Sequence, residues 1–429
     1  MLRRAALVAL LSACSSNPSD ETGSTTAGPS TSATDDATGD APTAASEATT
    51  SPTAATDASQ TGATTTAPTT GADETSTGAA AVDYNAPGPH PVGNARFTLQ
   101  AGDRALPVEL WYPADPAAAA AAAQGHPIEE FVPAGPDRDA MLGYLADLSP
   151  HGQIGTRLQT SSAFEAAPAG AGPWPLVVFS HCHNCVRFSA FSTLERLASH
   201  GFIVAAPDHV GNTLFDQQEQ VGEEFLVVRV ADMTAVLDAV LDPTHPDVPA
   251  DLRGLADPAR VGALGHSFGA LTTGRLAQND PRIKAAFPIA APLESPLSPD
   301  THMADIHVPL AWILAVEDNS ILQIGNNILV DNFNQANPPA RLISVADAGH
   351  WGFSDICGLV PMFDAGCGEG TRQTKPGEMF TYLDVAVGRE IAASYSTAFF
   401  DRWLRDNPDA DAFLDAPNPA EVVTLESRL

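Results

Sequence analysis

The pentapeptide "GHSFG", residues 265–269, places a serine between two glycines directly after a short apolar run. The run "RVGALG" is typical of a buried strand, and the following "FGALTTGRLAQ" has the spacing of a helix. A sharp strand-to-helix turn of this kind, the nucleophile elbow, exposes the serine hydroxyl and leaves no room for side chains at Gly265 and Gly269. The pattern therefore predicts Ser267 as a nucleophile, with the backbone N–H of Phe268 directed at a developing oxyanion.

A serine hydroxyl needs a general base before it becomes a good nucleophile. Where a strand, a serine elbow and a helix occur in a parallel sheet, the acid and then the histidine follow the serine in the chain. His350 lies in "VADAGHWG", a loop directly after the last predicted strand of the parallel series. His302 and His307 lie too early in the chain to follow an acid on the next strand. We therefore predict that His350 is the base.

The acid that orients the base is expected in the loop after the strand "PLAWILAVED". This strand ends with two carboxylates, Glu317 and Asp318. Asp318 is the preferred acid because it lies further into the loop, and Glu317 is the alternative. Either carboxylate could instead cap the helix that is predicted to begin near Ile321.

The loop "FSHCHNC", residues 179–185, follows an earlier buried strand and is expected to supply a second oxyanion donor. It also holds two histidines and two cysteines, which are ligand types for transition metals. Residues so close in the chain do not converge easily on one tetrahedral ion. A disulfide between Cys182 and Cys185 is therefore favoured over a metal site, while other cysteine pairings stay open. We expect no metal and no other cofactor.

Strands and helices alternate along most of the chain, which predicts the α/β class with a mostly parallel sheet covered by helices on both faces. An antiparallel pair is predicted first, at 95–100 and 106–113. The predicted strands then span 175–180, 202–208, 260–265, 283–290 and 309–318, with a strand and loop at 340–350. The predicted helices span 187–200, 223–241, 268–278, 321–336 and 384–405. Catalytic residues in such a sheet lie at the carboxyl ends of the strands.

The chain is strongly acidic, with 52 Asp and Glu against 21 Lys and Arg and a formal net charge of -31. This charge argues against nucleic acid as a partner and against electrostatic docking on anionic lipid. The expected partner is a small-molecule or polymeric substrate, and the oligomeric state stays open.

The N-terminus "MLRRAALVALLSAC" has two arginines followed by an apolar run that is too short to span a membrane. Its "LSAC" resembles the lipobox of bacterial lipoproteins, which implies a signal peptide over 1–14 and lipid on Cys14. Residues 15–85 are rich in Thr, Ser and Ala and predict a disordered acidic linker. We expect a lipid anchor in the cell envelope or at the cell surface, membrane contact through that lipid only, and a catalytic domain over 90–429.

Four cysteines remain once Cys14 is set aside, and an even number in an exported protein suggests disulfides. Cys357 and Cys367 would close a short loop, beside the tighter pair in the loop at 179–185. The catalytic domain also carries an insert at about 115–172 that could fold over the site as a lid. The piece "DRDAMLGYLADL" in this insert predicts a helix, and the alanine run 117–123 is either a helix or an unstructured insert.

The segment "PLVVFSHCHNCVRFSAFSTLERLASHGFIVAAPDHVGN", together with "GHSFG", resembles the platelet-activating factor acetylhydrolase (isoform II) family. It is also similar to chlorophyllases, cutinases and poly(ethylene terephthalate) hydrolases, and the resemblance covers roughly residues 95–405. It implies an α/β-hydrolase fold with Ser-His-Asp chemistry on carboxylic esters and no cofactor. By motif position, Ser267 matches the nucleophile, His350 the base and Phe268 one oxyanion donor. His183 matches the other donor through its backbone N–H.

Two departures from the acetylhydrolase pattern are visible. Cys182 stands where the family usually has glycine. The family also places its acid after the preceding strand, where this chain has only Ala290 and Ala291. An acid at Asp318 or Glu317 is more similar to the cutinase arrangement.

The leading hypothesis is a surface-anchored serine carboxylic ester hydrolase that prefers short acyl groups. A peptidase or amidase on the same fold is the alternative enzyme. A non-catalytic surface binding protein on a hydrolase scaffold is the alternative outside enzymes, and the intact Ser, His and Asp set argues against it.

Overall fold

The computed structural model describes residues 81–132, 134–135, 138–146, 160–170, 172–216, 222–355, 357, 363 and 366–429. The predicted signal peptide with Cys14, and the predicted linker up to residue 80, lie outside the described residues. Packing begins before the predicted linker boundary at residue 85. Tyr84 is buried, and its hydroxyl donates a hydrogen bond to the Asp401 carboxylate at 2.6 Å.

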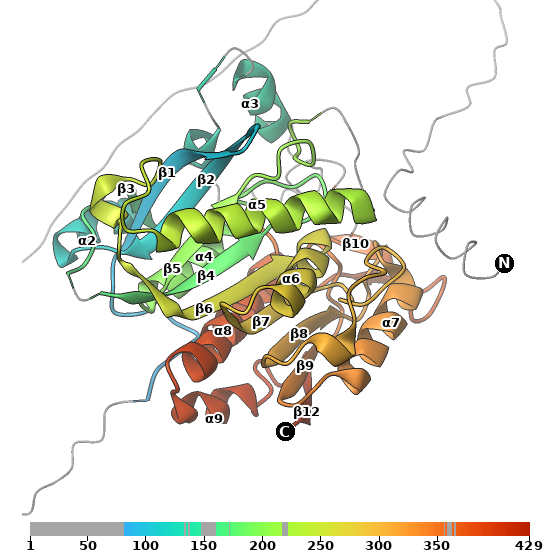
Figure 1. The fold of residues 1–429 in the computed structure, drawn as a ribbon. Coiled ribbons are helices and arrows are strands. Elements are labelled where there is room, and N and C mark those ends of the chain that lie inside the picture. The colour runs from blue at the N-terminus through green and yellow to red at the C-terminus, as the bar shows by residue number, and fades with distance from the viewer. Residues whose placement is uncertain are drawn as a thin grey trace, which may run out of the picture. The chain divides into compact units, whose positions relative to one another are not determined.

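Ten strands of the described chain form one sheet in the order β12-β9-β8-β7-β6-β4-β5-β2-β1-β3 (Figure 1). The strands are β1 (Val92–Ala101), β2 (Arg104–Pro113), β3 (Ser162–Phe164), β4 (Trp174–Ser180), β5 (Ile203–Pro207), β6 (Ala256–His266), β7 (Ile283–Ile289), β8 (Leu310–Ala315), β9 (Ala340–Val345) and β12 (Val423–Arg428). The series from β5 through β4, β6, β7 and β8 to β9 is parallel. Strand β2 is antiparallel to β1 and to β5, and β12 is antiparallel to β9.

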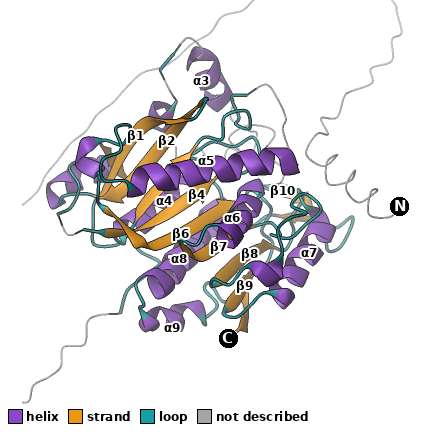
Figure 2. Cartoon of the chain, in the orientation of Figure 1, coloured by secondary structure: helices purple, strands orange, loops and turns teal. Residues whose placement is uncertain are grey.

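Helices cover both faces of this sheet (Figures 1 and 2). One face packs against α4 (Phe191–Ser199) and α8 (Val385–Leu404), and the other against α5 (Glu223–Leu241), α6 (Phe268–Asn279) and α7 (Leu322–Gln335). The central strands are apolar on both sides because each face needs its own core. In β4, Val177 and Phe179 belong to the core under α4 and α8, whereas Leu176 and Val178 belong to the core under α5 and α7.

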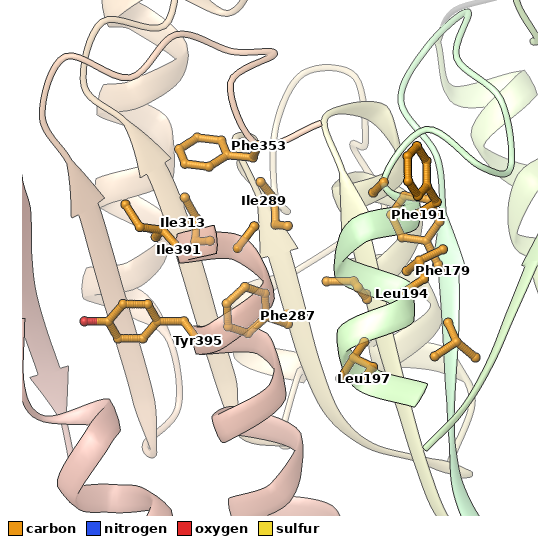
Figure 3. Close-up of a cluster of buried hydrophobic side chains, with 14 of the residues drawn as sticks. Phe179, Phe191, Leu194, Leu197, Phe287, Ile289, Ile313, Phe353, Ile391 and Tyr395 are labelled. Carbon is orange, nitrogen blue, oxygen red and sulfur yellow. The ribbon is translucent and has the colours of Figure 1, made fainter. Parts of the chain in front are cut away.

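Figure 3 shows the first of these cores. Leu194 and Leu197 of α4 lie over Phe179, while Ile391 and Tyr395 of α8 lie beside Phe287 of β7. These side chains are almost completely buried. The packing fixes the carboxyl ends of the central strands relative to one another, and these ends carry the residues predicted to do chemistry.

The insert at 115–172 has structure of its own. Its described part contains the 3₁₀ turns Pro116–Ala118 and Ile128–Phe131, the helices α2 (Ala119–Gln124) and α3 (Arg138–Ala146), and strand β3. The alanine run is therefore helical. Strand β3 pairs in parallel with β1 and extends the sheet at its far edge.

The remaining elements are short. They are the hairpin β10 (Glu369–Thr371) and β11 (Met379–Thr381), the helix α9 (Asp411–Leu414), and the 3₁₀ turns Ala250–Leu252, Met303–Asp305 and Pro408–Ala410. None of the described helices is long and apolar enough to span a membrane.

The predicted α/β class and the alternation of strands and helices are confirmed. The predicted helix at 187–200 begins only at Phe191. The preceding residues form a turn around the buried guanidinium of Arg187, which pairs with Asp208 at 2.7 Å and Glu109 at 3.1 Å. The antiparallel strand β12 was not predicted from the sequence.

Candidate active site

Ser267 lies at the turn between β6 and α6, with φ 56° and ψ −121°. A positive φ is strained for a residue with a side chain, so the surrounding structure must hold it. The backbone N–H of Ser267 donates to the carbonyl oxygen of Ile289 at 2.8 Å, which ties the turn to the end of β7. The strained turn predicted from "GHSFG" is therefore present.

Both glycines of the motif are needed for space. A Cβ at Gly269 would lie 1.9 Å from the carbonyl oxygen of Ser180, at the end of β4. A Cβ at Gly265 would lie 2.1 Å from the carbonyl oxygen of Gly269. Because backbone atoms oppose both positions, no side-chain movement could relieve these contacts.

The structure brings Ser267, His350 and Asp318 into one hydrogen-bonded chain. The Oγ of Ser267 lies 2.8 Å from Nε2 of His350, and Nδ1 of His350 lies 2.7 Å from Oδ2 of Asp318. The histidine and the aspartate are completely buried. A carboxylate on Nδ1 holds that nitrogen as the N–H, so Nε2 presents its lone pair to the serine hydroxyl.

Asp318 also holds the turn that precedes α7. Its Oδ1 accepts the backbone N–H groups of Ser320 and Ile321, both at 2.9 Å. The sequence offered capping and orientation of the base as alternatives for this carboxylate. The helix α7 has no side-chain cap, so the capping alternative is not what Asp318 does. Its Oδ1 instead closes the turn before the helix, and these bonds fix the direction of the oxygen that faces the histidine.

Glu317 faces away from His350 and holds a different loop. Its carboxylate accepts the backbone N–H of Gln373 at 2.7 Å and that of Thr374 at 3.2 Å, and also a hydrogen bond from the Thr374 hydroxyl. Burial raises the pKa of Glu317, but these hydrogen bonds and Arg372 outweigh it, so the pKa lies below its usual range. The geometry favours Asp318 over Glu317 as the partner of the base.

His266, the second residue of the motif, supports the histidine loop. Its Nε2 lies 2.9 Å from the carbonyl oxygen of His350, and its ring lies 5.2 Å from the His350 ring. Burial and the neighbouring His350 lower the pKa of His266 to about 3, so the ring is neutral and Nε2–H donates to this carbonyl.

The predicted oxyanion loop lies against the elbow. His183 and Phe268 both line the cavity beside Ser267, and neither backbone N–H bonds to another described residue. Cys182 and Cys185 form the predicted disulfide across His183, with their Cα atoms 5.1 Å apart. The second predicted disulfide is also formed, since Cys357 and Cys367 are joined with Cα atoms 6.2 Å apart.

A buried arginine, Arg229, was not predicted from the sequence and supports the oxyanion loop through hydrogen bonds. Arg229 of α5 is completely buried and donates to the Ser180 hydroxyl at 3.0 Å, to the carbonyl oxygen of His181, and to Oδ1 of Asn212 at 2.6 Å. Its guanidinium also lies 4.8 Å from the centre of the Phe268 ring. The arginine thus links both candidate oxyanion residues, because Asn212 contacts His183 in turn.

The same region holds a second Ser-His-Asp chain. Ser180 Oγ lies 3.0 Å from Nε2 of His209, and Nδ1 of His209 lies 3.0 Å from Oδ2 of Asp232. All three side chains are buried, and none of them lines the cavity at Ser267. The Ser180 hydroxyl is further occupied by the guanidinium of Arg229. This second set of hydrogen-bonded side chains supports the structure at the end of β4.

A sequence signal for this support exists. Arg229 and Asp232 lie three positions apart on the buried face of helix α5, among apolar residues. Buried charges in such a helix require partners. Only the fold shows that the partners come from the start of β2, the end of β4 and the loop after β5.

A cavity of about 60 Å³ opens beside Ser267. Apart from Ser267, the candidate oxyanion residues and two further serines, Ser295 and Ser320, its wall is apolar, with Leu271, Ala291, Pro292, Leu297, Ile321 and Ile328. No residue of the insert at 115–172 belongs to this lining in the described chain. The described part of the insert is therefore not a lid over this cavity.

No group of three or more potential metal ligands is assembled among the described residues. The alternative interpretation of the loop at 179–185 was a metal site. Its two cysteines, Cys182 and Cys185, are bonded to each other. Both nitrogens of His181 are engaged as well, with the carbonyl oxygen of Cys182 and the backbone N–H of His209.

Comparison with known proteins agrees with this fold. The model of the dienelactone hydrolase family matches residues 162–355, and that of platelet-activating factor acetylhydrolase, isoform II, matches residues 78–224. Cutinase est2 of Thermobifida alba is 34% identical over 130 residues, 30% of this chain and 37% of that protein. Platelet-activating factor acetylhydrolase of Cavia porcellus is 25% identical and covers 54% of this chain and 58% of its own length.

The solved structure of a ferulic acid esterase from Streptomyces cinnamoneus covers 79% of this chain and 96% of its own, with a TM-score of 0.54 and 23% identity. The sheet order, the elbow and this likeness define an α/β-hydrolase. Within that fold, parts of the chain are similar to dienelactone hydrolases, to isoform II acetylhydrolases and to cutinases. It spans between about a third and three fifths of the length of the curated relatives described here.

Proposed function

We propose that this protein is a serine carboxylic ester hydrolase. The observation that carries the proposal is the chain from Asp318 through His350 to Ser267, which ends in an apolar cavity at a strained elbow. Curated relatives named as cutinases and as an acetylhydrolase favour ester substrates over amides. A peptidase or amidase has no comparable support.

The geometry supports a two-step acyl transfer. His350 takes the Ser267 proton as the oxygen attacks the ester carbon, and Asp318 stabilises the imidazolium that forms. The backbone N–H groups of His183 and Phe268 bind the oxyanion. The imidazolium protonates the leaving alcohol, and the same histidine then activates water to release the acid.

The cavity supports a preference for short acyl groups. The cavity is small, at about 60 Å³, and its wall is largely apolar. A longer chain would place methylenes outside the apolar wall and lose about 0.8 kcal/mol of burial for each of them. We expect p-nitrophenyl acetate and butyrate to have a higher kcat/KM than the palmitate. Rates that rise steadily to the palmitate would contradict the short-acyl preference.

Labelling with a fluorophosphonate tests the nucleophile directly, because the probe reacts with activated serines. We expect the wild-type protein to be labelled and to hydrolyse p-nitrophenyl butyrate, and the Ser267→Ala variant to do neither. The Ser180→Ala variant is the matched control, since Ser180 has the same kind of partners but no cavity. Unchanged turnover in a folded Ser267→Ala variant would refute the assignment.

The place of action is a separate part of the proposal. The lipobox-like "LSAC" and the acidic segment 15–85 support a lipid anchor on Cys14 with a tether that holds the catalytic domain away from the membrane. An enzyme held in this way would act on ester material outside the cell. That material includes bulky or polymeric esters as well as small molecules.

A further inference from the structure

The side chain of His183 has an unused hydrogen-bonding group in the cavity. The ring is 9% exposed and lines the same cavity as Ser267. Nδ1 lies 2.7 Å from Nδ2 of Asn212, while Nε2 has no partner among the described residues. Nε2 is not one of the fully buried atoms without a partner, so water or a ligand can reach it and accept its hydrogen bond.

The buried arginine determines which nitrogen of His183 carries the proton. A guanidinium can only donate, so the 2.6 Å contact of Arg229 identifies the facing atom of Asn212 as its amide oxygen. The amide nitrogen of Asn212 then faces His183 and can only donate to it. Nδ1 is therefore the acceptor, and the ring hydrogen lies on Nε2.

The ring is also neutral at ordinary pH. Burial, with the positive charge of Arg229 as a second cause, lowers the pKa of His183 to about 4. A neutral ring with Nδ1 occupied offers a single N–H donor and no charge. Near it, the wall of the cavity is apolar at Leu271 and Leu297. The hydroxyl of Ser295 is engaged with the backbone N–H of Leu297 and with the hydroxyl of Ser298.

We propose that the Nε2–H group of His183 recognises the substrate. It would donate to an oxygen, such as an ether, hydroxyl or second carbonyl oxygen, on the part of the ester that enters the cavity. The inference rests on the proposed esterase function and narrows it to esters with a second polar group close to the scissile carbonyl. A site with a directed donor discriminates against an apolar analogue of the same size, because the donor is then left unpaired.

Two pairs of substrates of matched size test this recognition. p-Nitrophenyl methoxyacetate and butyrate differ by an ether oxygen in place of a methylene, and the levulinate and 4-methylpentanoate differ by a carbonyl in place of a branched carbon. For each pair, the measured quantity is the ratio of kcat/KM values, polar over apolar. The intrinsic reactivity of each ester is the same for every variant. It therefore cancels when the ratio of one variant is divided by the ratio of another.

We expect the His183→Phe variant to lower the ratio by about tenfold or more for at least one pair. Phenylalanine keeps an aromatic ring and the backbone N–H but removes the donor. The His183→Gln variant should recover part of the ratio, because its amide can donate from a similar position. The Ile328→Val variant, which changes the same wall without a donor, should change both members of a pair by the same factor.

Each outcome decides between the two proposals. Hydrolysis with the same ratio in the wild type, His183→Phe and His183→Gln would overturn the recognition role and leave the esterase intact. No hydrolysis of any substrate by the wild-type protein would overturn the esterase proposal itself. If the phenylalanine variant does not fold, the wild-type ratio divided by the ratio of hydroxide-catalysed rates measures the same preference. A value near one would then contradict the role of His183.

Discussion

Glu317 and Asp318 are adjacent in the chain, yet their carboxylates have different partners. Asp318 faces His350 and the start of the next helical turn, while Glu317 binds the backbone at Gln373 and Thr374. The sequence narrows the acid to these two residues, because both end the same strand. Their separate roles depend on contacts with residues more than thirty positions away, which no local pattern encodes.

Exchange of each carboxylate for its amide separates the two roles. We expect Asp318→Asn to lower kcat by about 10⁴-fold, because the amide no longer holds His350 in the required tautomer. Glu317→Gln should keep most of kcat but lower the stability by about 1–3 kcal/mol, since the loop at 372–374 loses charged hydrogen bonds. Steady-state kinetics and thermal unfolding of both variants measure this. A larger loss of kcat in Glu317→Gln would show that the acid assignment is wrong.

The elbow between β6 and α6 depends on the end of β4, which lies against it. Because Gly269 has no side chain, the first turn of α6 can pack against the Ser180 carbonyl. A Cβ at position 269 would lie only 1.9 Å from that oxygen. One close contact between backbones thus positions β6, the turn at Ser267 and α6 relative to β4. A change here acts on the position of the nucleophile without touching the triad.

We therefore expect Gly269→Ala to abolish more than about 99% of esterase activity or to prevent folding, because the backbone must move to admit the methyl group. Gly143→Ala in α3 is the matched control. Its Cβ would meet no atom within 4 Å, and alanine in a helix stabilises by about 0.5–1 kcal/mol relative to glycine. Activity and the unfolding midpoint of both variants check the expectation. Wild-type activity in Gly269→Ala would contradict the close packing.

The elements that the sequence predicts well are those with a strong local signal. The parallel strands are continuous apolar runs, the helices have a 3.6-residue period, and the elbow has its glycines. Strand β12 was missed because four of the six residues in "VTLESR" are polar and because the strand pairs only at the edge, with β9. The support around Arg229 was missed because its partners come from separate loops. Hydrogen bonds between distant segments are fixed by the packing of the whole sheet.

Across the molecule, several histidines are buried and neutral. Burial lowers the pKa of His183 to about 4 and that of His266 to about 3, and it holds the pKa of His181 and His209 well below the usual value. The unfolded chain protonates these rings near pH 6.5, whereas the folded chain does not. The unfolded state therefore binds more protons below pH 6.5, and stability falls as the pH falls.

We expect the free energy of unfolding to decrease by about 1.4 kcal/mol for each such histidine between pH 7.5 and 5.5, a range in which most carboxylates stay ionised. Chemical denaturation at the two pH values measures the change. The His266→Gln variant should lose less stability over this range than the wild type. A stability that does not change between these pH values would contradict the expectation.

The proposed anchor belongs to the whole chain and is tested apart from the fold. In a bacterial host, we expect wild-type protein to incorporate labelled fatty acid and to sediment with membranes, because lipid chains on Cys14 would insert into the bilayer. The Cys14→Ser variant should do neither. The catalytic domain should hydrolyse p-nitrophenyl butyrate at the same rate in both proteins. A mature N-terminus without lipid in the wild-type mass spectrum would refute the anchor.

One buried set of side chains has the same residue types as a catalytic triad. It consists of Ser180, His209 and Asp232. Its two contacts, both 3.0 Å, are close to the 2.8 Å and 2.7 Å of the chain at Ser267. A template search that compares only hydrogen-bond distances would assign two active sites to one polypeptide. The difference lies in access, because one hydroxyl faces a cavity and the other faces a guanidinium. Titration with a serine-directed inhibitor should therefore reach its end point at one equivalent per chain.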